Sequence, residues 1–140
     1  MNIAESRVSF SLCTGEFPQL SSGLPLLKPD RLLVNLIRGI ADGGVLAAIV
    51  PDEKQIPAML PKWRRTGLEV RAFPLSPYTA SGKEVREIAV SVAALEPDLV
   101  VLDCMGFGMD IRNVFYEHTG RPVLLPRTIL ARIAAGIVEG

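Results

Sequence analysis

The chain has 140 residues, 49% of them hydrophobic, and its 15 lysines and arginines balance its 15 aspartates and glutamates. A net charge of zero gives no overall attraction to nucleic acid or to an anionic membrane surface, so we expect neither as a partner. No stretch approaches the roughly 18 uninterrupted apolar residues of a membrane-spanning helix, and the N-terminus does not resemble a signal peptide. We therefore expect a cytoplasmic protein whose two cysteines are free thiols.

The N-terminal part of the sequence predicts one strand followed by one helix. Residues 8–12 form an apolar, strand-like run that ends at a glycine turn. Further along, apolar residues recur at helical spacing on one face: Leu32, Leu33, Leu36, Ile37 and Ile40. We expect residues 1–42 to form an N-terminal strand-helix arm, whose apolar face and open strand edge recruit a second copy of the chain. The predicted assembly is a homo-oligomer, at least a dimer.

From residue 43 to residue 140, strand-like and helix-like segments alternate, which predicts one α/β domain. The strand-like segments are 45–50, 68–73, 99–102 and 123–125, the second nearer the sheet edge because Glu69 and Arg71 interrupt it. The helix-like segments are 53–66, 85–95, 109–117 and 128–138, with Pro57 and Pro61 delaying or kinking the first. Right-handed crossovers then give a flavodoxin-like, three-layer α/β domain with a four-stranded parallel sheet in the order 2-1-3-4.

Both cysteines lie where an apolar run gives way to a glycine turn, Cys13 after residues 8–12 and Cys104 after residues 99–102. Open α/β sheets place their chemistry at the carboxyl ends of strands, so each thiol stands where a nucleophile or proton carrier would. Two opposed thiols could exchange the proton next to a carboxylate, which nearby amides and hydroxyls could hold. The residues predicted to bind this carboxylate are Thr14, Gly15, Ser76, Thr79, Met105 and Gly106.

Packing alone could also explain these residues. Cysteine is among the most buried residue types, and residues 74–82 have the composition of an ordinary polar loop. Neither cysteine has a histidine or lysine beside it, whereas Asp103 adjoins Cys104 and Glu16 lies near Cys13. Carboxylates close to a sulfur would disfavour the thiolate and oppose its activation.

The motifs of nucleotide and metal sites are missing, and we expect neither a cofactor nor a metal. Residues 104–108 contain a single Gly-x-Gly, but Arg112 stands where a third glycine would help, and no Walker Lys-Ser or Lys-Thr pair is present. His118 is the only histidine and is expected on the surface near a helix end. The lysine and arginines of residues 62–65 are most simply explained as cations at a helix C-terminus.

Four segments carry a resemblance to a known family. DLVVLDCMGF at residues 98–107, continuing through RPVLLP at 121–126 and ILARIAA at 129–135, resembles the C-terminal signature of the AroM family. LCTGEFP at residues 12–18 resembles the other recurring motif of that family, which lies near the middle of the usual chain. The similarity extends over residues 8–138 and matches the C-terminal half to two-thirds of a typical member.

The AroM family resembles the cofactor-independent aspartate/glutamate racemases, which implies two pseudo-symmetric domains with a ligand cleft between them. By this resemblance, residues 1–42 are the remnant of an incomplete first domain, and Cys13 and Cys104 are candidate acid/base thiols. The expected function is binding of a small carboxylate or amino-acid-like ligand at the cysteine turns. Two alternatives stay open: a cofactor-independent amino-acid racemase or isomerase completed by oligomerisation, and a non-catalytic structural or interaction domain.

Overall fold

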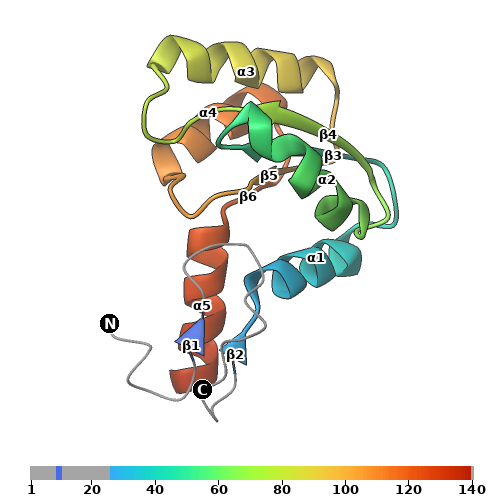
Figure 1. Ribbon diagram of the computed structural model, residues 1–140, viewed down its shortest axis with the longest axis vertical. Coiled ribbons are helices and arrows are strands. Elements are labelled where there is room, and N and C mark those ends of the chain that lie inside the picture. Colours follow the sequence, from blue (N-terminus) through green and yellow to red (C-terminus); the bar gives the residue numbers. More distant parts are fainter. Residues whose placement is uncertain (1–8, 11–25, 140) are drawn as a thin grey trace.

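The computed structural model of the protein describes residues 9–10 and 26–139. Four parallel strands form its main sheet. The strands are β3 (Val45–Val50), β4 (Glu69–Pro74), β5 (Leu99–Leu102) and β6 (Val123–Leu124). They stand in the order β4-β3-β5-β6, which confirms the predicted order 2-1-3-4 (Figure 1). A separate pair of two-residue strands, β1 (Ser9–Phe10) and β2 (Leu26–Leu27), is also parallel.

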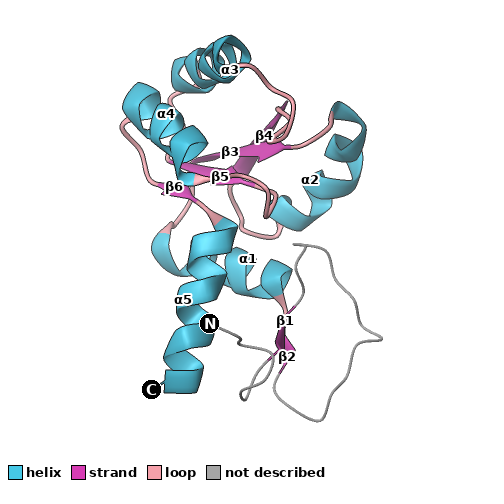
Figure 2. Cartoon of the chain, turned by 90° about the vertical axis from the view of Figure 1, so that its left-hand side faces the viewer, coloured by secondary structure: helices cyan, strands magenta, loops and turns pink. Residues whose placement is uncertain are grey.

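Helices cover both faces of the main sheet, so the predicted three-layer α/β architecture is confirmed (Figure 2). On one face lie α3 (Gly82–Ala94) and α4 (Met109–Thr119). On the other lie α1 (Pro29–Ile40) and α2 (Ile56–Arg64), and α5 (Pro126–Glu139) starts there and extends away from the sheet (Figure 1). Among the described residues, no helix combines the length and the apolar character that crossing a membrane requires.

The two interior strands, β3 and β5, are buried on both faces because their side chains alternate between two apolar clusters. Toward α3 and α4 point Ala47, Ile49, Val100 and Leu102. Toward α1 and α2 point Leu46, Ala48, Leu99 and Val101. Continuous apolar runs of this kind are typical of interior parallel strands. Strand β4 is at the edge, as predicted, and its Glu69 and Arg71 form an exposed ion pair at 2.6 Å.

Proline and aspartate determine where α2 begins. The Asp52 carboxylate accepts the N–H of Lys54 at 3.1 Å and caps a short 3₁₀ turn over Glu53–Gln55. Helix α2 then starts at Ile56, with Pro57 in its first turn, where the missing N–H would have no partner within the helix. The predicted delay of this helix is therefore confirmed.

Helix α1, which the sequence pattern placed in the N-terminal arm, packs on the main sheet. Leu33, Val34 and Ile37 are buried in the same cluster as Trp63 of α2. The apolar face of α1 is therefore covered within the chain, and Ile40 is its one large apolar residue that is mostly exposed, at 56%. The predicted dimer loses one of its two arguments and stays a prediction, as does the domain boundary at residue 42.

We expect two adjacent glycines before β3 to differ in their tolerance of a side chain. Gly43 and Gly44 have φ angles of +137° and +107°, but only at Gly44 would a Cβ collide with another group, the Asp98 carboxylate. That carboxylate accepts the N–H of Val45 at 2.8 Å. Gly43→Ala should lower the free energy of unfolding by about 1 kcal/mol through backbone strain, and Gly44→Ala by about 2–3 kcal/mol. Urea unfolding measures both losses, and equal losses would contradict the role of Asp98.

Candidate functional site

The turn that carries Cys104 lies where the strand order of the sheet reverses. The chain leaves β3 toward β4 on one side and returns to β5 on the other, so the helices that follow β3 and β5 lie on opposite faces. In open α/β sheets, a crevice opens between two such strands at their carboxyl ends, and ligands bind there. Residues 103–108, which connect β5 to α4, therefore stand at the position that this fold favours for a site.

Cys104 is a free, half-buried cysteine that packs against the cluster between the sheet and α3 and α4. Its N–H donates to the Leu102 carbonyl at 2.8 Å, and its carbonyl accepts the N–H of Phe107 at 3.3 Å. Its sulfur accepts the N–H of Gly106 at 3.4 Å. Because Phe107 is fully buried, it anchors this turn in the core. The thiol and one backbone amide thus lie together on a tight turn that is half-open to solvent.

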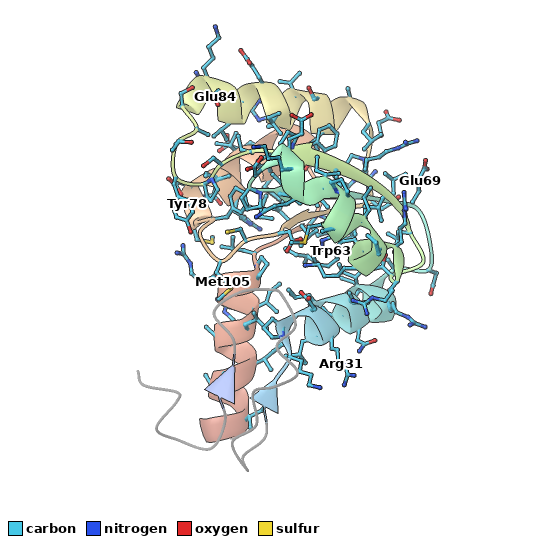
Figure 3. The ribbon with its side chains drawn as sticks, viewed as in Figure 1. Arg31, Trp63, Glu69, Tyr78, Glu84 and Met105 are labelled. Atoms are coloured by element: carbon cyan, nitrogen blue, oxygen red, sulfur yellow. The ribbon has the colours of Figure 1, made fainter. Side chains whose placement is uncertain are left out.

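The loop between β4 and α3 reaches this turn through Tyr78. A Cβ at Gly106 would collide with the hydroxyl group and ring of Tyr78, so the glycine allows the phenol to lie directly over the turn. Figure 3 shows Tyr78 and Met105 at the same end of the sheet, far from Glu69 at the opposite end. The β4–α3 loop and the Cys104 turn, both predicted to bind the ligand, therefore meet at the carboxyl edge of the sheet.

Ser76 and Thr79 of that loop differ in what their hydroxyl groups already do. The Ser76 oxygen accepts the backbone N–H groups of Tyr78 and Thr79, each at 3.2 Å. Ser81 caps α3 by accepting the N–H of Glu84 at 3.2 Å. These are the bonds of an ordinary polar turn, the alternative that the composition left open. Thr79 is exposed, so its hydroxyl group is accessible to a ligand.

Arg127 belongs to this edge, although the sequence pattern did not single it out. It lies in the first turn of α5, two residues after Leu125, which follows β6. A Cβ at Gly108 would come within 3.0 Å of one of its guanidinium nitrogens and 3.1 Å of Asp110 Oδ1, so Arg127 reaches back to the end of the Cys104 turn, where a carboxylate also lies. It is exposed and forms no ion pair with another described residue. Its place after a parallel strand was the available signal, because such strands share one carboxyl edge.

A groove of about 260 Å³ opens beside the end of β4. It is lined by Pro51, Asp52, Glu53, Pro74, Leu75, Ser76, Glu84, Glu87 and Ile88. Four of these residues carry carboxylates and none is basic, so the groove repels an anion. Although Ser76 lines it, the groove is a poor site for the predicted carboxylate ligand.

A buried ionic network lies immediately before Cys104 in the sequence. The Lys62 ammonium is 3.1 Å from Asp30 Oδ1 and 3.1 Å from each carboxylate oxygen of Asp103. Asp103 also accepts the indole N–H of Trp63 at 2.7 Å. All four side chains belong to buried residues. The interpretation of residues 62–65 as cations at a helix end accounts for the two exposed arginines, but not for Lys62.

The side chains of Asp103 and Cys104 lie on opposite faces of the sheet. Asp103 faces α1 and α2, where Lys62 and Trp63 hold it, whereas Cys104 packs on the α3 and α4 side. The carboxylate that adjoins the thiol in sequence is therefore engaged on the far face and partly neutralised there. The sequence offered two signals of this network. One is a lysine beside a tryptophan on the apolar side of α2, and the other is an aspartate directly after a buried strand.

Three of the predicted site residues, Cys13, Thr14 and Gly15, lie outside the described residues. Within the described part of the chain, no three His, Cys, Asp or Glu side chains form a group that could hold a metal ion. His118 is exposed in the last turn of α4, as predicted, with its Nδ1 2.8 Å from the Val114 carbonyl oxygen.

The family model described as AroM protein matches residues 2–138, nearly the whole chain. No curated protein and no solved structure is significantly similar to it. The matched segment includes both cysteines and the whole turn at residues 103–108. This chain therefore belongs to the AroM family.

Proposed function

We propose that this protein binds a small carboxylate, such as an amino-acid-like acid, at the Cys104 turn. One observation carries the proposal: a partly buried cysteine and an arginine that has no ion pair among the described residues meet at the same turn, at the carboxyl edge of the sheet. Membership of the AroM family supports a relationship with the racemase-like superfamily, which agrees with a carboxylate as the ligand.

Charge-assisted hydrogen bonds would hold the ligand. A guanidinium offers two parallel N–H donors to a carboxylate, and Arg127 is within reach of the Gly108 end of the turn. The N-terminal end of α5, a helix of 14 residues, adds partial positive charge beside Arg127. At the other end of the turn, the Gly106 N–H already donates to the Cys104 sulfur, so the predicted contributions of Thr79 and of the amide near Met105 stay predictions. Because Cys104 and Gly108 belong to the same short turn, we expect a carboxylate held by Arg127 to restrict access to the Cys104 sulfur.

The proposal concerns binding and leaves catalysis open. Exchange of the proton next to a carboxylate needs a base on each face of the carbon, each within roughly 3–4 Å of it. The second predicted thiol, Cys13, lies outside the described residues, so a racemase completed by a partner chain stays a prediction. A reduced Cys104 is compatible with the cytoplasm, which we propose as the location of this protein.

Alkylation of Cys104 by iodoacetamide, in a Cys13→Ser background that leaves one thiol, tests the proposal. A carboxylate over the turn shields the sulfur, so glutarate at ten times its dissociation constant should slow alkylation about tenfold. The uncharged diamide of glutaric acid should leave the rate unchanged. Unaltered alkylation at about 50 mM glutarate, where even millimolar affinity would saturate the site, would overturn the proposal.

A pair of arginine variants tests the anchoring role of Arg127. Arg127→Gln should remove most of the protection by glutarate, because the neutral side chain offers no charge-assisted pair of donors. The matched control is Arg121→Gln, which changes an exposed arginine just before β6, at the opposite end of that strand. Equal protection in both variants would reject Arg127 as the anchor.

A further inference from the structure

Asp103, the residue immediately before Cys104, is held from three directions. Its N–H donates to the carbonyl of Ile49 in β3 at 2.7 Å. Its carboxylate accepts the indole N–H of Trp63 at 2.7 Å and contacts the ammonium of Lys62, both from α2. Lys62 in turn contacts Asp30 in the first turn of α1. Asp103 thus connects β5 to β3 through its backbone and to α2 through its carboxylate, and Lys62 extends the connection to α1.

A network of this kind contributes more to geometry than to net stability. Removing charges from water costs about as much as their mutual attraction returns, so apolar side chains of the same volume would often stabilise a fold equally well. Apolar side chains, however, would not hold residue 103 in one direction. The bonds of Asp103 are directional, and their donors lie on the α2 side of the sheet.

We propose that Lys62, Trp63 and Asp30 are positioning residues that fix Asp103 and thereby the direction of the Cys104 thiol. The Cys104 N–H bonds to the Leu102 carbonyl at 2.8 Å and closes a three-residue turn centred on Asp103, so the direction in which Asp103 is held also sets the direction of the next side chain. Cys104 packs on the α3 and α4 side, and its sulfur meets the N–H of Gly106. This inference deepens the proposed function because it concerns the same turn, but it involves no ligand.

The rate at which iodoacetamide alkylates Cys104, without ligand or denaturant and again in the Cys13→Ser background, tests this role. Lys62→Met keeps the side-chain stem but removes the ammonium, which leaves two carboxylates that repel each other. Asp103 should then leave its place part of the time, and Cys104 should become alkylated about tenfold faster. Asp30→Asn, which keeps the shape and an oxygen acceptor near Lys62, should raise the rate by a smaller factor.

The matched control is Ile37→Ala, which opens a cavity under α1 on the same face of the sheet, in the cluster that contains Trp63, but removes no polar atom of the network. It is expected to lower stability but to leave the alkylation rate within about twofold of the parent. If Ile37→Ala accelerates alkylation as much as Lys62→Met does, the network acts only through stability and the proposal is wrong. If Lys62→Met does not fold, the comparison of Asp30→Asn with Ile37→Ala decides: acceleration in Asp30→Asn alone supports the proposal, and equal rates reject it.

This result is independent of ligand binding. Absence of protection by glutarate would reject the proposed function, yet faster alkylation in Lys62→Met would still establish the positioning role. Protection by glutarate would support the proposed function. Equal alkylation rates in Lys62→Met and Ile37→Ala would at the same time reject the positioning role.

Discussion

Replacing Lys62 by methionine is expected to lower the free energy of unfolding by about 3–5 kcal/mol. The ammonium is shared between Asp30 and Asp103, and all three residues are buried, with exposures of 6%, 5% and 2%. Its removal leaves two buried carboxylates without the cation that they share, at a place where burial keeps water away from them. Urea unfolding followed by tryptophan fluorescence measures the loss, because Trp63 is the only tryptophan and bonds to Asp103.

The control for this experiment is Arg64→Met, two residues further along the same helix. Arg64 is exposed and forms no ion pair with another described residue, so its replacement should change stability very little. A loss below about 1 kcal/mol in Lys62→Met would contradict the role of the buried network, since breaking a buried ion pair costs more than that.

Replacing Phe107 by alanine is expected to cost about 3–5 kcal/mol of stability and to free the Cys104 turn. Phe107 is fully buried in the cluster under α3 and α4, and its N–H donates to the carbonyl of Cys104 at 3.3 Å. Its ring is therefore the apolar anchor of the turn, beside the turn's own hydrogen bonds and the network around Asp103. Urea unfolding measures the stability, and alkylation of Cys104 in the Cys13→Ser background measures the freedom of the turn.

Phe115→Ala provides the comparison, because Phe115 is equally buried in the same cluster but lies in α4, outside the turn. Both variants should lose similar stability, whereas only Phe107→Ala should accelerate alkylation by about tenfold without denaturant. Equal alkylation rates in the two variants would show that the turn does not depend on Phe107 for its conformation.

The order of the sheet could be derived from the sequence because its determinants are local. The apolar run of β3, residues 45–50, was predicted at its observed bounds, and charged residues in β4 indicated an edge strand. Prolines and helical periodicity placed the helices within a few residues of their observed positions. The handedness of the crossovers then left few topologies, so the strand order followed. Cys104 was placed at the end of β5 by the same local reasoning.

Only the tertiary structure decided which side chains meet at that strand end. Asp30 and Asp103 are 32 and 41 residues from the lysine they share, and no local pattern pairs them. Arg127 meets Gly108 only because α5 begins beside the neighbouring turn. Periodicity assigns a side chain to a face of a helix or strand, whereas such contacts depend on how several elements pack at once. The sequence therefore determined the scaffold and the thiol, and packing determined the groups around it.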